Sequence, residues 1–392
     1  MNGEALSLPL VEAPETRELR QTVRTISEKY GHDYFVRTSR DGASPTELWA
    51  ELGRAGLLGV NVPEEYGGGG GGMTELAVIT EELAASGIPL MLMALSPAVC
   101  ATTLLKHGSA ELRRRWLPQL ASGEAVMAFA ITEPDAGSNA HRIRTRAVRD
   151  GAEWVVSGSK YYVSHIDNAD AILVVAKTGE PDERGRHPLS LFVMDVDAPN
   201  LGKSEIPVEI TSPERQFSLS FDDVRLPAEA LVGAEGKGLA ALFSGLNPER
   251  IGSAALLNGI ARYALDKAAR YARERTVWDV PIGAHQGIAH PLAKAHVEVE
   301  GARLMAARAA AMYDAGLAAA GAAANMAKFA ASEAASHALD AAIQTHGGNG
   351  MATEYGLATL SGLVRLFRIA PVSTEMILNH IAQHELDLPK SY

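Results

Sequence analysis

Cysteine, long apolar runs and basic charge are all scarce in this sequence. Its 392 residues include a single cysteine, Cys100, which excludes an internal disulfide framework and fits a reducing compartment such as the cytoplasm. No uncharged apolar stretch approaches the ~20 residues of a membrane-spanning helix, and no basic segment followed by an apolar run opens the chain. We therefore expect neither membrane insertion nor export. The formal net charge of -11 argues against a nucleic-acid binder, because binding phosphates requires a basic surface.

The composition and the hydrophobic pattern predict three domains. Hydrophobic residues make up 47% and charged residues 21% of the chain, which is typical of a globular protein too long for a single core. Apolar residues recur at helical spacing up to about Ser122, alternate as in strands from Val126, and return to helical spacing beyond Gly236. We predict an N-terminal α-helical domain (1–124), a middle antiparallel β-sandwich or barrel (125–237) and a C-terminal helical bundle (238–392).

The stretch from Phe129 to Asn139 joins an apolar run to a polar turn. The run predicts a strand that ends at Thr132, and the Pro, Gly, Ser and Asn that follow leave backbone N–H groups and hydroxyls free for a ligand. An anion or the ring of a cofactor is held in this way. Taken alone, the stretch is also the ordinary end of a strand, which is the commoner case.

Three further stretches combine a possible ligand contact with a plain structural interpretation. Gly158–Ser164 is a good strand that carries an aromatic residue and a hydroxyl, and Arg273–Trp278 is a charged helix end. Gln344–Gly350 is a helix end followed by a glycine-rich loop, whose backbone N–H groups have the freedom to approach a phosphate. Within it, His346 has no partner at metal or triad spacing, so we predict no metal site.

The four stretches, in this order and spacing, resemble the acyl-CoA dehydrogenase family over nearly the whole chain. The resemblance implies its three-domain fold and bound FAD, with the forked guanidinium of Arg275 reaching the dinucleotide of a neighbouring subunit. Departures are Asn139 for a usual Asp, Tyr162 for a usual Trp, and Trp278-Asp279 for Phe-Gly. The implied cofactor contacts are Phe129, Thr132, Gly137, Ser138, Tyr162, Ser164, Arg275, Trp278, Gln286, Gln344, Gly347, Gly348 and Ser373.

The same resemblance implies removal of a proton from carbon 2 of an acyl thioester by a carboxylate, while a hydride leaves carbon 3 for flavin N5. Many members carry that base in a Glu-Gly-Thr segment near the C-terminus, but here Pro371 takes the place of the glutamate. In isovaleryl-CoA and long-chain dehydrogenases a glutamate directly before an arginine is the base instead, and Glu249-Arg250 matches that arrangement. Ser138, Asn247, Arg250, Ala370 and Pro371 would then contact the substrate.

An ordinary structural role for Glu249 remains open. We expect Asn247 to cap a helix and Pro248 to take its first position, where the helix dipole alone favours an acid in the first turn. The dipole and Arg250 should also lower the pKa of Glu249 until a bound acyl chain excludes water.

Three functions compete. The first is an FAD-dependent acyl-CoA dehydrogenase that passes electrons to an electron-transfer flavoprotein or a similar acceptor. The second is a flavin enzyme of the same fold with other chemistry, such as hydroxylation or another acyl-thioester transformation. The third is a non-catalytic subunit of a mixed oligomer. Neither the acyl chain nor the carrier, coenzyme A or an acyl-carrier protein, follows from the residues. A homodimer or homotetramer is expected because one FAD should touch two subunits.

Overall fold

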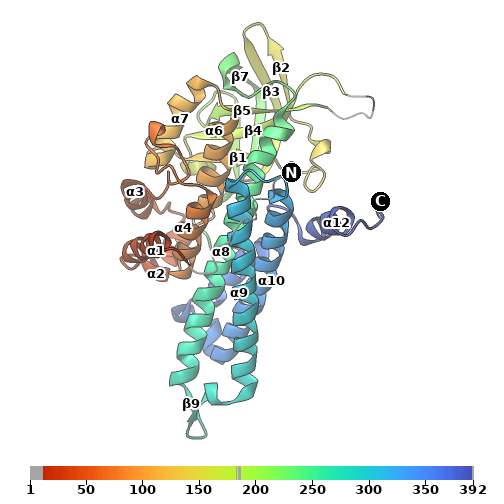
Figure 1. Cartoon of the computed structure of the whole chain (residues 1–392). Coiled ribbons are helices and arrows are strands. Elements are labelled where there is room, and N and C mark those ends of the chain that lie inside the picture. The colour runs from red at the N-terminus through yellow and green to blue at the C-terminus, as the bar shows by residue number, and fades with distance from the viewer. Residues whose placement is uncertain (1–11, 182, 184–186, 391–392) are drawn as a thin grey trace.

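The computed structural model describes residues 12–181, 183 and 187–390, and helices make up the first part of the chain (Figure 1). Leu48, Leu52, Leu76 and Leu83 recur at helical spacing and are fully buried, so the amphipathic pattern finds its core. The start of the chain, on which the expectation of no export rests, lies outside the described residues. The helices are α1 (Pro14–Ser27), α2 (Gly31–Arg40), α3 (Thr46–Arg54), α4 (Met73–Ala85), α5 (Leu92–Leu95), the π-helix η2 (Ser96–Ala101), α6 (Thr102–His107) and α7 (Ala110–Ser122).

The strands that follow form one eight-stranded sheet. Its order is β6-β7-β3-β2-β4-β5-β8, with β1 paired in parallel to β4 and most other pairs antiparallel. A turn at Gly151, where φ is +62°, joins β2 to β3. The strands are β1 (Met127–Ala130), β2 (Arg146–Asp150), β3 (Glu153–Ser164), β4 (Ala171–Lys177), β5 (Leu189–Asp195), β6 (Leu201–Ile206), β7 (Gln216–Pro227) and β8 (Leu231–Val232).

Long helices form the last part of the chain. They are α8 (Gly238–Glu274), α9 (Gln286–Asp314) and α10 (Ala320–His346), followed by α11 (Ser361–Leu366) and α12 (Thr374–His384). Buried alanines line the facing sides of α8, α9 and α10, and their small side chains let the helices pack closely. Between α8 and α9, the short hairpin β9 (Thr276–Val277) and β10 (Val280–Pro281) lies at the end of the bundle farthest from the sheet (Figure 1).

The start of α8 differs from the prediction. The helix begins at Gly238, so Pro248 lies inside it and Asn247 is not an N-cap. Glu249 is therefore in the fourth turn, beyond the reach of the N-terminal dipole, and the dipole argument for its pKa is wrong. Buried contacts extend the helix upstream: Ala241 and Leu242 join the cluster that contains Phe129.

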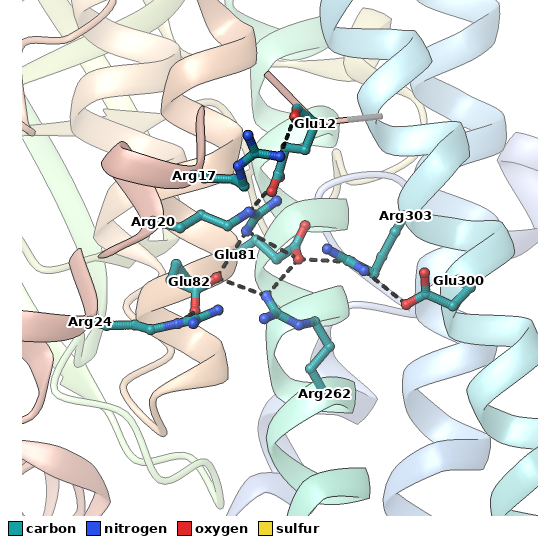
Figure 2. Close-up of polar contacts among 9 residues, drawn as sticks. All are labelled: Glu12, Arg17, Arg20, Arg24, Glu81, Glu82, Arg262, Glu300 and Arg303. Atoms are coloured by element: carbon teal, nitrogen blue, oxygen red, sulfur yellow. Dashed lines mark hydrogen bonds and ion pairs between the residues drawn. The ribbon is translucent and has the colours of Figure 1, made fainter. Parts of the chain in front are cut away.

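A buried ionic cluster ties the N-terminal helices to the bundle (Figure 2). Glu81 and Glu82 of α4 are 7% and 2% exposed and face arginines from α1, α8 and α9. Arg262 bonds both carboxylates at 2.7 and 3.0 Å, and Arg303 of α9 bonds Glu81 at 2.8 Å. Arg20 and Arg24 of α1 complete the cluster on Glu82. Together these pairs fix α4 between α1 and the bundle.

Among the described residues, no helix is long and apolar enough to cross a bilayer.

Candidate active site

The turn after β1 presents a row of hydrogen-bonding groups at the surface. Phe129 is buried in the strand, whereas Gly137 and Ser138 are exposed and Thr132 is partly exposed. The hydroxyls of Thr132 and Ser138 have no hydrogen-bond partner within the described part of the chain. A Cβ on Gly137 would meet nothing within 4 Å. The turn therefore has the open surface and the free donors that a polar ligand needs.

Tyr162 and Ser164 lie beside this turn, on β3. The backbone N–H of Tyr161 donates to the carbonyl of Thr132 at 2.8 Å, which joins the two stretches directly. Tyr162 has a φ of +55° and is 53% exposed, a strained conformation for a large side chain held away from the core. The Ser164 hydroxyl bonds Gln216 at 3.0 Å. The structure thus brings together the residues predicted for the flavin ring.

Glu249 is a buried carboxylate without a compensating hydrogen bond. It is 9% exposed, and its Oε2 has no partner among the described residues. Burial raises its pKa to about 7, although Arg250 and Lys328 pull in the opposite direction. A carboxylate that is half ionised near neutral pH is suited to act as a general base. An acid with a purely structural role in a first helical turn would face bulk solvent, whereas the side chain of Glu249 is buried.

Glu249 is linked to the end of β1 through the π-helix. Cys100 in η2 is fully buried, and its Sγ contacts the carbonyls of Met127 and Ala128 at 3.6 Å. Burial, together with the nearby charge of Glu249, raises the pKa of the Cys100 thiol. Leu246, one turn before Glu249, packs on the cluster that contains Phe129. A π-helical turn often occurs at a functional site, and this one separates the carboxylate from the strand. The predicted base and the predicted flavin residues are therefore in one region.

Of the proposed substrate residues, Asn247 and Arg250 lie on α8, and Ala370 and Pro371 lie in a segment bonded to α10. Arg250 is 7% exposed and donates through Nη1 to Asn247 Oδ1 at 3.1 Å. Lys328 of α10 is fully buried and donates to the carbonyl of Val372 at 2.8 Å, which fastens the segment containing Ala370 and Pro371 to the bundle. In the same segment, the Ser373 hydroxyl accepts from Met376 N at 3.3 Å and caps α12. That bond is a structural role for a residue predicted to contact the cofactor.

A second set of predicted cofactor residues lies far from the first. Arg275, Trp278, Gln286, Gln344, Gly347 and Gly348 are all exposed, with Trp278 84% exposed at the tip of the β9–β10 hairpin. Tyr271 stacks on His346 at 4.3 Å and bonds Asn349, so the glycine-rich loop adjoins the end of α8. Figure 1 places this end of the bundle opposite the sheet. One chain therefore does not bring the two sets of residues together.

Beside the candidate site, the sequence analysis missed the buried charged residues Glu133, Lys160 and Lys328. Lys160 and Glu133 form an ion pair inside the turn after β1, and Lys328 lies within the bundle. Lys328 was the one detectable case, because it is the single charged residue in the alanine-rich stretch from Ala320 to Ala331. A charge in the middle of an apolar helix pattern must be paired or functional.

Three domain families match the chain in order. The acyl-CoA dehydrogenase N-terminal domain matches residues 13–124, the middle domain 128–224 and the C-terminal domain 236–386. Acyl-CoA dehydrogenase FadE12 of Mycobacterium tuberculosis is 52% identical over 383 residues, which cover 97% of this chain and 98% of that protein. The structure of glutaryl-coenzyme A dehydrogenase with glutaryl-CoA superimposes with a TM-score of 0.91 at 31% identity over 97% of both chains. PigA with FAD and proline gives 0.90 at 25% identity over 97% of this chain and 99% of that one.

The chain belongs to the acyl-CoA dehydrogenase family. The family and the three-domain fold predicted from the motifs are confirmed, and so is the predicted activity, an oxidoreductase that acts on the CH–CH group of an acyl thioester. The individual site residues remain predictions that rest on the geometry described above.

Proposed function

We propose that this protein desaturates an acyl-CoA thioester between carbons 2 and 3, with Glu249 as the base. The observation that carries the proposal is the state of Glu249, a buried carboxylate with a pKa raised to about 7 and one oxygen unpaired. Such a group removes a weakly acidic proton better than an exposed carboxylate, because its basicity is higher and water does not compete. Pro371 cannot take a proton, so no acid is available at the place where many relatives have one.

FAD is the cofactor, and the residues at the end of β1 suit it. The unpaired hydroxyls of Thr132 and Ser138, the open backbone at Gly137 and the projecting ring of Tyr162 are a donor set for a flavin ring with its phosphates. FAD supplies the hydride acceptor when it is bound. The solved structure of PigA, a protein of the same fold, contains FAD.

The chain's own residues have distinct roles in this proposal. Glu249 takes the proton from carbon 2, and Arg250, ordered by its bond to Asn247, contacts the coenzyme A arm. Ser138 lies near the thioester. The small Ala370 beside Pro371 leaves room for a branched or bulky acyl group, and Lys328 holds that segment in place.

A second subunit completes the cofactor site in this proposal. Arg275, Trp278, Gln286 and the loop at Gln344 are exposed. They belong to the end of the bundle near β9, whereas Thr132 follows β1, in the sheet at the opposite end (Figure 1). The long guanidinium of Arg275 suits a pyrophosphate held by a neighbouring chain. A homodimer or homotetramer follows, with an electron-transfer flavoprotein or a similar acceptor as the redox partner.

Anaerobic mixing with a panel of straight and branched acyl-CoA thioesters tests this function. We expect bleaching of the yellow flavin band with at least one thioester, and a loss of about a thousandfold or more in the bleaching rate for Glu249→Gln. The exposed Glu111→Gln variant is the matched control and should bleach at the normal rate. Bleaching of Glu249→Gln at an undiminished rate would remove Glu249 from the mechanism.

A further inference from the structure

A buried ion pair lies between the two stretches that form the flavin site. Lys160 Nζ of β3 is 2.9 Å from Glu133 Oε1, and the two side chains are 0% and 5% exposed. Glu133 directly follows Thr132, and Lys160 comes two residues before Tyr162. The pair is thus placed behind the residues that would touch the cofactor.

Glu133 organises three backbone segments at once. Its Oε2 accepts from Arg144 N at 2.6 Å, and its Oε1 accepts from Thr145 N at 3.0 Å as well as from Lys160. Lys160 also donates to the carbonyl of Ile131 at 2.9 Å. One carboxylate and one ammonium therefore connect the end of β1, the start of β2 and the middle of β3. Every charged atom of the pair has a partner, which is the condition for a buried pair to be tolerated.

The surrounding backbone leaves this junction little freedom. Gly158 has a φ of +142°, and a Cβ there would lie 2.6 Å from the Cα of Thr145. The Thr145 hydroxyl donates to the carbonyl of Ser159 at 2.9 Å. The register of β3 against β7 shifts between Lys160 and Val163, so that Tyr162 turns outward directly after the anchored lysine. The conformation of Tyr162 therefore depends on where Lys160 is held.

Stability alone is a poor reason for such a pair. Two apolar side chains of similar volume stabilise a core about as well as a buried ion pair, because desolvation offsets the attraction between the charges. Burial lowers the pKa of Lys160 to about 8, whereas the ammonium and the N–H donors keep the pKa of Glu133 below its usual value. What a fully bonded pair adds over an apolar one is a fixed geometry.

We propose that Glu133 and Lys160 are the positioning residues of the cofactor site, which hold Thr132 and Tyr162 in the arrangement that would bind FAD and set the charge next to Thr132. This inference rests on the proposed function for the identity of the ligand. The pair is neutral as a whole, so loss of Lys160 leaves the Glu133 carboxylate, held by the backbone N–H groups of Arg144 and Thr145, as a buried anion next to Thr132. Loss of Glu133 instead removes the partner that keeps the buried lysine protonated, so Lys160 becomes a neutral amine. The two losses should therefore have different effects on the flavin.

The test compares Glu133→Gln, Lys160→Met and the double variant with the wild-type holoenzyme. We expect the dissociation constant of FAD, measured by titration of the stripped protein, to rise at least tenfold in each single variant and less in the double variant. We expect the flavin midpoint potential to fall in Lys160→Met, which leaves an anion, and to stay near the wild-type value in Glu133→Gln, which leaves a neutral amine. The control is Arg225→Gln, which breaks the exposed 2.7 Å pair with Glu153 on the same sheet and should change neither quantity.

The outcomes separate this inference from the function on which it rests. Wild-type protein that binds FAD, together with single variants whose FAD affinity stays within twofold, overturns the positioning role alone. Equal shifts of the flavin potential in both single variants also overturn it, because a merely structural disturbance does not depend on which charge is lost. If a single variant fails to fold, the double variant is measured in its place. A double variant that binds FAD more weakly than both the wild type and Arg225→Gln supports the positioning role, and a double variant that binds FAD as tightly as the wild type contradicts it. Wild-type protein that binds no FAD overturns both proposals.

Discussion

Replacing Glu249 with glutamine should stabilise the protein at neutral and alkaline pH. A carboxyl group whose pKa rises from 4.5 in the unfolded chain to about 7 in the fold binds its proton more tightly when folded. Its contribution to stability is complete below pH 4.5 and is lost as the pH rises through about 7. Above that pH, folding must hold an ionised carboxylate in a buried site, and a neutral amide of the same shape does not carry this cost.

The structure gives the size of this effect. A shift of about 2.5 pKa units corresponds to about 3 kcal/mol at pH 8 and about 2 kcal/mol at pH 6. Because Oε2 of Glu249 has no hydrogen bond among the described residues, the substitution removes no partner there. The cost of burying the amide is the same at both pH values. The gain of Glu249→Gln should thus be larger at pH 8 than at pH 6 by about 1 kcal/mol.

Urea unfolding with FAD in fixed excess, followed by far-UV circular dichroism, measures this difference. The wild type, Glu249→Gln and the exposed control Glu111→Gln are compared at pH 6 and pH 8. The control should lie within about 0.5 kcal/mol of the wild type at both. A Glu249→Gln protein that is less stable than the wild type, or whose advantage does not grow with pH, would refute the conclusion that this carboxylate is held in an unfavourable environment for use in catalysis.

Three further predictions concern the rest of the molecule. Glu82→Gln should lower the free energy of unfolding by about 3 kcal/mol at pH 7 and by about 1 kcal/mol less at pH 4. The reason is that the arginine partners overcome desolvation and lower the pKa of Glu82 to about 2, so its stabilisation is lost as the pH falls from 4.5 toward 2. Urea unfolding at both pH values measures the difference between variant and wild type, and a difference independent of pH contradicts the prediction. The kcat/KM for the best acyl-CoA should rise with pH through about 7, as Glu249 ionises, and a flat profile from pH 6 to 8 would exclude it as the group that titrates. Because Arg275 is exposed, Arg275→Ala should leave the free energy of unfolding of the FAD-free chain within about 0.5 kcal/mol of the wild type. The same variant should retain less FAD on gel filtration. Full retention of FAD would remove Arg275 from the cofactor site.

Much of the fold was predictable because local signals agree with tertiary packing. The turn at Gly151 and the apolar strand from Ala171 to Ala176 each have a local cause, a residue that accepts positive φ and a run of side chains buried in the sheet. The start of α8 was not predictable in this way. Pro248 is typical of a first helical turn, but buried contacts at Ala241 and Leu242 extend the helix upstream through it.

The candidate site was predictable as a set of motifs but not as an environment. Spacing indicates Thr132 and Tyr162, whereas the pair of Glu133 and Lys160 behind them depends on the register of β2 against β3, which no local pattern contains. The elevated pKa of Glu249 likewise arises from burial by η2 and α10, segments about 150 and 80 residues away in the chain. Desolvation is a property of the packed site, so the sequence alone gave the wrong sign for that pKa.

The most direct measurement of the central claim follows the proton itself. The holoenzyme is incubated in deuterium oxide with a 3-thia-acyl-CoA, a thioester that exchanges its carbon 2 hydrogens but has no hydrogen to lose from position 3. Mass spectrometry then reports deuterium at carbon 2 over time. If Glu249 is the base, the wild type incorporates deuterium, while Glu249→Gln binds the same compound and FAD but exchanges at least a hundredfold more slowly. Exchange at the wild-type rate in Glu249→Gln would show that another group removes the proton.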